Sequence, residues 1–196
     1  MIISFEGGEG AGKTTQIRLV CSYLDKRQIP WLSFREPGGS AISEEIRKVF
    51  INKDLDPVSE LLLILASRKE NISQLIEPAL SKGKIVLIDR FIDSTLVYQG
   101  ILGGIGIAKV KEIMHITSTY IEPDITILLD ISPEIALARI CQGDRFETRP
   151  MSYHTKIREA FIQVARFRRH HRVDAARSIE EIHKDIISII TNKIAI

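Results

Sequence analysis

Short apolar runs alternate with longer stretches of helical periodicity along the 196-residue chain. Two runs, "KIVLID" at 84–89 and "ITILLD" at 125–130, are apolar almost without interruption, as central strands covered on both faces should be. The pattern predicts strands at 2–6, 31–35, 84–89, 124–130 and near 172–174. It predicts helices at about 13–28, 41–52, 57–82, 92–121 with breaks, 133–140, 151–169 and 178–193. Strands that alternate with helices indicate an α/β fold, with a mostly parallel five-stranded sheet and helices on both faces.

The composition fits one globular domain that spans residues 1–196. Hydrophobic residues make up 44% of the chain, which is enough to form a core. Neither Cys21 nor Cys141 has a metal-ligand spacing, which favours a reduced, cytoplasmic protein. The apolar C-terminal stretch is interrupted by Asn192 and Lys193, so we expect a core helix there and no membrane partner.

The net charge of +2 does not indicate a nucleic-acid partner, but the charge is unevenly distributed. Residues 139–177 contain ten Lys/Arg and four Asp/Glu. A local basic segment of this kind suits a polyphosphate ligand, although a solvated helix face has the same composition. Its densest part, 166–172, could touch RNA, but we expect a solvated helix end.

A glycine-rich loop follows the first predicted strand and opens the first predicted helix. Gly7 to Thr14 matches G-x-x-x-x-G-K-[ST], the P-loop pattern, in the structural context that the motif requires. Glycines let backbone N–H groups point inward as an anion nest, and the helix start adds its positive dipole end. Lys13 is placed to reach the outer phosphates of a nucleotide, and the Thr14 hydroxyl to bind Mg²⁺.

Asp89 ends the apolar strand 84–89, and Arg90 follows it directly. In P-loop proteins a carboxylate at this place holds Mg²⁺ or takes part in phosphoryl transfer, although a helix N-cap would use the same residue. The guanine motif N-K-x-D is absent from the sequence, because Ala195 stands where its Asp would follow Asn192 and Lys193. A small kinase that carries its own arginines therefore fits better than a GTPase.

Several further segments make the chain resemble the thymidylate kinase family, the nucleoside monophosphate kinases that phosphorylate dTMP. They are "FEGGEGAGKTTQ" (5–16), "REPGG" (35–39), "ASR" (66–68), "DR" followed by "STLVYQG" (89–100), "PDITILLDISPE" (123–134), "DRFE" followed by "YHTKIREAF" (144–161) and "VDA" (173–175). The resemblance implies a P-loop NTPase-like fold, ATP and dTMP as ligands, Mg²⁺ and a homodimer.

The resemblance also implies roles for individual residues. For dTMP it implies Glu9, Arg35, Pro37, Ile64, Arg68, Arg90, Ser94, Thr95, Tyr98 and Gln99. For ATP it implies Gly7, Gly8, Glu9, Gly10, Ala11, Gly12, Lys13, Thr14, Thr15, Arg139 and Arg149, and for Mg²⁺ Thr14 and Asp89. From the pattern alone, Arg68 could equally be a surface arginine and Tyr98 a core aromatic.

A short lid at about 141–149 is expected to close over ATP. Ala11 stands where some relatives have a P-loop arginine, so a lid arginine must stabilise the charge on the transferred group. We expect Arg145 to do this, with Arg149 as the alternative. The expected catalytic residues are Lys13, Arg90, Arg145, Glu9 and Asp89. Ile64 replaces a phenylalanine that stacks on thymine in many relatives, so some activity on dUMP is expected.

The predicted reaction is the transfer of the γ-phosphoryl group of ATP to dTMP, giving ADP and dTDP for dTTP biosynthesis. Two alternatives stay open at the level of sequence. One is a kinase for another nucleotide or deoxynucleoside, and the other is a regulatory P-loop protein that hydrolyses nucleotide slowly, which the short lid favours.

Overall fold

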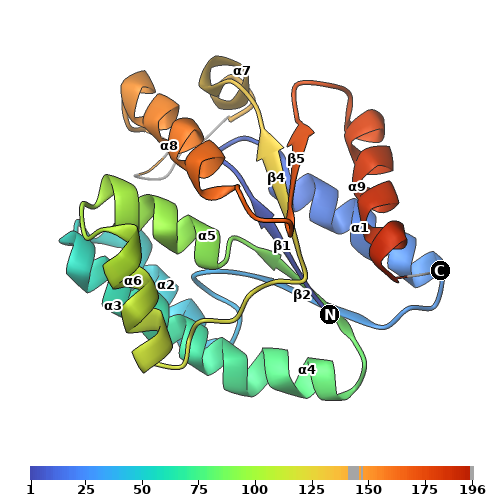
Figure 1. Cartoon of the computed structure of the whole chain (residues 1–196), viewed down its shortest axis with the longest axis horizontal. Helices are drawn as coiled ribbons and strands as arrows, with labels where there is room; N and C mark the ends of the chain where they lie inside the picture. Colours follow the sequence, from blue (N-terminus) through green and yellow to red (C-terminus); the bar gives the residue numbers. More distant parts are fainter. Residues whose placement is uncertain (141–145, 147, 195–196) are drawn as a thin grey trace.

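A computed structural model describes residues 1–140, 146 and 148–194 of the chain (Figure 1). Its centre is a five-stranded sheet with the order β2-β3-β1-β4-β5, in which every neighbouring pair is parallel. The strands are β1 (Ile2–Glu6), β2 (Trp31–Arg35), β3 (Ile85–Asp89), β4 (Ile125–Asp130) and β5 (His170–Asp174). The predicted α/β fold with a parallel sheet is therefore confirmed.

Helices cover both faces of this sheet, as Figure 1 shows. One face packs against α1 (Lys13–Lys26) and α9 (Ile179–Ile194). The other packs against α3 (Pro57–Asn71), α4 (Glu77–Ser81), α5 (Ile92–Thr95), α6 (Ile107–Ile116) and α8 (Met151–Val164). The remaining helices are α2 (Ala41–Asn52), which contacts α3, and α7 (Pro133–Leu137), which follows β4.

The two-residue period of the strands divides the core between these faces. In β1, Ile3 and Phe5 belong to the cluster under α1 and α9, whereas Ile2 belongs to the opposite cluster. In β3, Val86 and Ile88 face the opposite cluster in the same way. Strands buried on both faces need apolar residues at nearly every position, which explains the continuous apolar runs in the sequence.

Two segments of π-helix interrupt the helices on the side of α3. The helix expected at 57–82 is α3, then the π-helical segment η1 (Ile72–Ile76), then α4. The expected region 92–121 contains α5, the π-helical segment η2 (Leu96–Leu102) and α6. In η2 the N–H of Gly103 donates to the carbonyl of Tyr98 at 2.8 Å, a five-residue step that characterises the wider π turn. Such turns are frequent at functional sites.

The basic stretch after α8 is not the helix end that the sequence pattern predicted. α8 ends at Val164 rather than at 169, and β5 begins at His170. The side chains of Arg169 and His170 are only 9% and 3% exposed, because both bind the carboxylate of Asp93. A long-range ion pair thus overrides the local helical pattern, and the expectation of a solvated helix end at 166–172 is wrong for these two residues. α7 likewise ends at Leu137 instead of 140.

The C-terminal helix α9 packs as a core helix, with Ile182, Ile186 and Ile190 buried against the sheet. Within residues 1–140 and 148–194, no helix combines the length and apolar character that crossing a membrane requires.

Candidate active site

A cavity of about 790 Å³ opens at the carboxyl ends of the strands, where ligands bind in open α/β sheets. Its wall contains most of the residues that the sequence singled out. They are Glu9 to Thr15, Arg35, Pro37, Ile64, Arg68, Asp89, Arg90, Ser94, Thr95, Tyr98, Gln99 and Arg139. A volume in this range suits small-molecule ligands. Gly7 and Gly8 line a smaller neighbouring cavity instead.

The loop between β1 and α1 has the backbone geometry that its glycines allow. Gly7, Gly10 and Gly12 have φ values of 137°, 69° and 91°, in the region that residues with a Cβ rarely adopt. At Gly10 an added Cβ would also lie 2.2 Å from the carbonyl oxygen of Ala136. This close approach holds the loop against α7.

Lys13, the first residue of α1, is buried against this loop. Its Nζ donates to the carbonyl oxygens of Gly7 at 3.1 Å and Gly8 at 2.8 Å. Burial and the positive charge of Arg90 lower the pKa of Lys13 to about 8. The ammonium group therefore binds neutral carbonyl oxygens, and an anionic ligand can compete with them for it.

Thr14 and Asp89 meet at the loop although 75 residues separate them. The Thr14 hydroxyl donates to Oδ2 of Asp89 at 2.9 Å. The N-cap residue of α5 is Phe91, so Asp89 is not the N-cap of this helix. Two oxygen ligands suit Mg²⁺, which takes its remaining ligands from phosphates and water. In the described part of the chain, no group of three or more His, Cys, Asp or Glu side chains forms a metal site.

Arg90, Glu9 and Tyr98 form a cluster beside the P-loop. Arg90 adopts a φ of 66°, which is unusual for a residue with a Cβ, and its Nη1 donates to the carbonyl of Gly7 at 3.0 Å. Its Nη2 and the Tyr98 hydroxyl both donate to Oε1 of Glu9, at 3.1 and 2.7 Å. Burial would raise the pKa of Glu9, but the positive charges of Arg90 and Lys13 lower it below its ordinary value.

Arg68 is buried in the wall of the cavity and is not a surface arginine. Its Nε donates to Oε2 of Glu36 at 2.8 Å, and its Nη2 donates to the Thr95 hydroxyl at 2.8 Å. The guanidinium also lies 4.9 Å from the centre of the Phe91 ring. Burial raises the pKa of Glu36, although Arg68 opposes this rise. Because Glu36 compensates the charge, Arg68 suits a neutral base better than a phosphate.

Ser94 and Gln99 reach the cavity wall but are held by acidic residues. The Ser94 hydroxyl donates to Oε2 of Glu6 at 2.5 Å, and Nε2 of Gln99 donates to Glu60 at 3.0 Å. These bonds fix the orientation of both side chains before any ligand binds.

Arginines expected at the donor end are not all gathered there. Arg139 lines the cavity and donates to the carbonyl of Ala175 at 3.1 Å. Arg149 has a side chain 48% exposed, lies 3.7 Å from Asp54, and does not contribute to the cavity wall. Arg145, with most of the lid expected at 141–149, lies outside the described residues.

Several residues of the wall were not assigned a role from the sequence. Phe50 and Phe146 stack with ring centres 5.7 Å apart, and Phe146 also meets the edge of the Tyr98 ring. Glu36 stands inside the quoted motif "REPGG", so its charge was a visible signal. The others are Gln16, Arg47, Ile51, Phe91, Arg177, Ser178, Ile179 and Ile182. Their positions depend on long-range packing that local patterns do not reveal.

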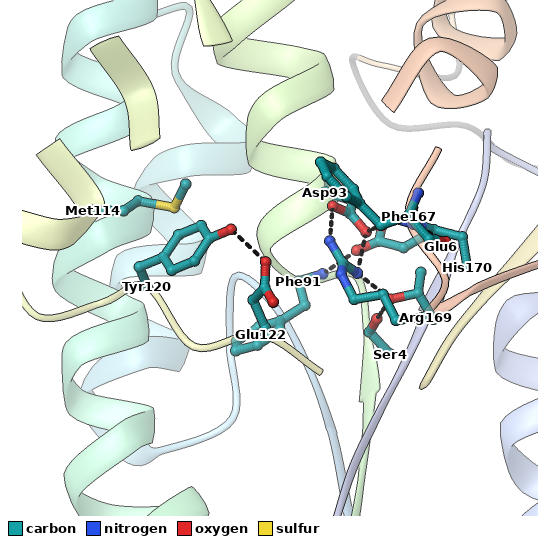
Figure 2. Close-up of polar contacts among 12 residues, drawn as sticks. Ser4, Glu6, Phe91, Asp93, Met114, Tyr120, Glu122, Phe167, Arg169 and His170 are labelled. Carbon is teal, nitrogen blue, oxygen red and sulfur yellow. Dashed lines mark hydrogen bonds and ion pairs between the residues drawn. The ribbon is translucent and has the colours of Figure 1, made fainter. Parts of the chain in front are cut away.

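A buried polar network supports the cavity from behind (Figure 2). Glu6, at the end of β1, accepts from the N–H of Phe91 at 2.9 Å and from Ser94. Arg169 donates to both oxygens of Asp93, at 2.8 and 2.7 Å, and His170 lies 2.9 Å from the same carboxylate. The network joins the start of α5 to both β1 and β5, and thus fixes the turn that carries Arg90.

Fold and site together define a P-loop nucleotide-binding protein. The glycine loop matches the P-loop pattern, Lys13 lies against it, and Thr14 pairs with Asp89 at the same edge of the sheet.

Comparison with known proteins identifies the family. The sequence profile described as Thymidylate kinase matches residues 5–186. The chain is 45% identical over 193 residues to "Thymidylate kinase" of Symbiobacterium thermophilum, covering 95% of this chain and 90% of that protein. It is 42% identical over 194 residues to "Thymidylate kinase" of Thermoanaerobacter sp. strain X514, covering 96% of each. For "Thymidylate kinase" of Synechococcus sp. strain JA-3-3Ab the identity is 38% over 193 residues, covering 97% and 95%. The chain belongs to the thymidylate kinase family, which confirms the resemblance seen in its motifs.

Proposed function

We propose that this chain transfers the γ-phosphoryl group of ATP to dTMP, giving ADP and dTDP. One observation carries the proposal: the P-loop with Lys13 and the cluster of Arg90 with Glu9 line the same cavity. Two phosphate-binding elements side by side suit a reaction in which two nucleotides meet at their phosphates. The bond between the γ-phosphorus and the oxygen of ADP breaks, while a phosphate oxygen of dTMP bonds to that phosphorus.

The donor half uses the P-loop amides, Lys13 and the start of α1 to hold the triphosphate. Thr14 and Asp89 fit as protein ligands of Mg²⁺, since both offer oxygen atoms at one point. When bound, Mg²⁺ neutralises charge on the phosphate oxygens. Arg139, beside the carbonyl of Ala175, suits the nucleoside end of ATP.

The acceptor half places a planar, charged Arg90 where it can pair with the dTMP phosphate in bidentate fashion. Glu9 and Tyr98 lie next to it, where the sugar follows the phosphate. Arg68, Thr95 and Gln99 also line the cavity and offer polar groups to a base. Holding the reactants in line lowers the entropic part of the barrier.

Ile64 sets the apolar part of the proposed base site. Its side chain is 7% exposed and lines the cavity. An apolar pocket discriminates one methyl group by only about 1–3 kcal/mol. We therefore propose dTMP as the preferred acceptor and dUMP as a slower one.

The test is a panel of acceptors at fixed ATP and Mg²⁺, with dTMP, dUMP, dCMP and dGMP compared by ADP release and by chromatography of the product. dTDP should form fastest. ATP hydrolysis that needs no acceptor and yields no dTDP would instead indicate a regulatory nucleotide hydrolase, and a faster rate with dCMP or dGMP would indicate another kinase.

Arg90→Ala is the matching variant for the acceptor site. We expect turnover to fall by two orders of magnitude or more, in the range seen when a preorganised charged donor is removed. Arg172→Ala is the control, because its side chain is 54% exposed and pairs with Asp130 away from the large cavity. Normal dTMP phosphorylation by folded Arg90→Ala would remove Arg90 from the acceptor site.

We also propose that the whole chain works as one domain, in a cytoplasmic homodimer formed through α2 and α3. These adjacent helices expose Ile42, Val49, Val58 and Leu62 at 52%, 46%, 53% and 57%. Light scattering on Leu62→Glu tests this, with Ile116→Glu on α6 as a control that is also exposed. The proposal predicts a monomer for the first variant and a dimer for the second.

A further inference from the structure

One oxygen of the Glu9 carboxylate is buried without a donor. Oε1 accepts two hydrogen bonds, from Arg90 and Tyr98. Oε2 has no hydrogen-bond partner among the described residues, although the side chain is only 8% exposed. The ring of His154 faces it, with Nδ1 at 3.8 Å from Oε2.

His154 lies near the start of α8 and is 4% exposed. On its other side, Nε2 lies 3.2 Å from the carbonyl oxygen of Arg149. A carbonyl oxygen can only accept, so Nε2 has to carry the hydrogen in this contact. The ionised carboxylate of Glu9 also only accepts. A ring N–H at Nδ1 points toward the free oxygen of Glu9, and a ring N–H at Nε2 points toward the carbonyl of Arg149.

Glu9 and His154 line a small cavity of about 20 Å³ between the P-loop, β4, α7 and α8. The charge of Arg158, which also faces this cavity, is compensated by Asp130. A buried carboxylate oxygen that lacks a donor carries a free-energy penalty, so the contact with the ring of His154 matters for Glu9.

Other charged or titratable groups face the pair from the neighbouring elements. Lys13 of α1 and Arg90 after β3 act on Glu9, and Tyr98 of η2 binds it directly. From α8 itself, the Tyr153 ring meets the His154 ring edge to face at 5.8 Å. The positive charges of Lys13 and Arg90 keep Glu9 ionised. Its free oxygen is therefore a strong acceptor that faces His154.

We propose that His154 is a positioning residue of the acceptor site. From the side of Nδ1 its ring holds Oε2 of Glu9, so that Oε1 stays on Arg90 and Tyr98 in the geometry that receives the acceptor nucleotide. Through the carbonyl of Arg149, the same ring ties this carboxylate to the chain that enters α8. The inference rests on the proposed function, because it assigns Glu9 to the acceptor side of that reaction.

Two substitutions of His154 test its contact with Glu9 and its contact with Arg149 independently. His154→Asn places an amide near the position of Nδ1 and keeps a donor for Glu9. His154→Gln reaches the position of Nε2, keeps the donor for Arg149 and loses the contact with Glu9. We expect His154→Gln to lower kcat/KM for dTMP about tenfold or more, with KM for ATP nearly unchanged. We expect His154→Asn to recover most of the loss. If His154→Gln performs as well as His154→Asn or better, the proposal is overturned.

A spectroscopic test does not depend on turnover. Imidazole ¹⁵N shifts of the folded protein identify which ring nitrogens carry protons, and the signal that disappears in His154→Asn assigns the residue. We expect Glu9→Gln to change the ¹⁵N shift of Nδ1, which faces Glu9, while the shift of Nε2, which faces the carbonyl of Arg149, stays nearly constant. An unchanged Nδ1 shift refutes the pairing. If the protein makes no dTDP, the proposed function fails, while this comparison still decides whether the pair exists.

Discussion

Glu6→Gln probes the proton balance of the network behind the cavity. Glu6 is 1% exposed, and its carboxylate receives hydrogen bonds from the Phe91 N–H and the Ser94 hydroxyl. Burial, reinforced by the negative charge of Asp93, raises the pKa of Glu6 to about 7. Burial would also raise the pKa of Asp93, but His170 and Arg169 lower it below its ordinary value. The proton therefore resides on Glu6 rather than on Asp93, and both side chains are drawn in Figure 2.

The magnitude follows from proton linkage. The folded state keeps a proton on Glu6 up to about pH 7, whereas the unfolded chain loses it near the ordinary value of 4.5. Between these values the unfolded state binds fewer protons, so the free energy of unfolding falls as pH rises. The contribution is fully present below pH 4.5 and is lost as pH passes 7. It amounts to at most about 1 kcal/mol per pH unit and about 3 kcal/mol in all.

The Glu6→Gln side chain would keep the geometry without the titration, because its amide oxygen can accept from Phe91 while its amide nitrogen donates to Ser94. The assay is urea unfolding followed by circular dichroism at pH 5.5, 6.5 and 7.5. The wild type should lose stability over this range more steeply than Glu6→Gln. Glu45→Gln is the control, because Glu45 is a surface residue with a side chain 70% exposed, and its curve should parallel the wild type. If Glu6→Gln keeps the wild-type slope, Glu6 does not hold the proton and the reasoning is wrong.

Three further substitutions test other parts of the molecule. Lys13→Met should lower kcat by several orders of magnitude, because it removes the cation expected to hold the phosphates. Thermal unfolding should stay near that of the wild type, because the two hydrogen bonds lost are offset by relief of a buried charge whose pKa burial lowers to about 8. Gly10→Ala should destabilise the protein clearly more than Gly12→Ala in urea titrations, since only the former places a Cβ against Ala136, and equal losses would contradict this. Asp93→Asn should lower the free energy of unfolding by about 3–5 kcal/mol, because it leaves its buried guanidinium partner without a counter-charge, and a loss below about 1 kcal/mol would argue against the ion pair.

The sequence predicts those features that depend on local patterns. Uninterrupted apolar runs place β3 and β4 correctly to within a residue. The meeting of Thr14 and Asp89 follows from strand order, because both lie at the carboxyl edge of neighbouring parallel strands. What the pattern cannot reveal is a charge whose partner is distant. Arg169 continues a helical pattern in the sequence. In the structure it lies after the end of α8 and donates to the carboxylate of Asp93, which is 76 residues away.

The pairing of Arg68 with Glu36 is a second case of the same kind. Arg68 is a charged residue in an otherwise apolar helix, and Glu36 lies in a turn. No local pattern in the sequence indicates that their side chains form an ion pair. The π-helical step at Leu96–Leu102 is also invisible in the periodicity, because one extra residue per turn is absorbed within a short apolar stretch.

The two outermost strands of the sheet differ in character from the three inner ones. β2 is only half-buried and ends in Arg35, and β5 exposes Arg172 and Asp174 along its length. Charged margins discourage another chain from extending the sheet by backbone hydrogen bonds. The proposed association of two copies is thereby directed away from strand addition and toward helical surfaces, so a variant that replaces both Arg172 and Asp174 with apolar residues should be more prone to form fibrils.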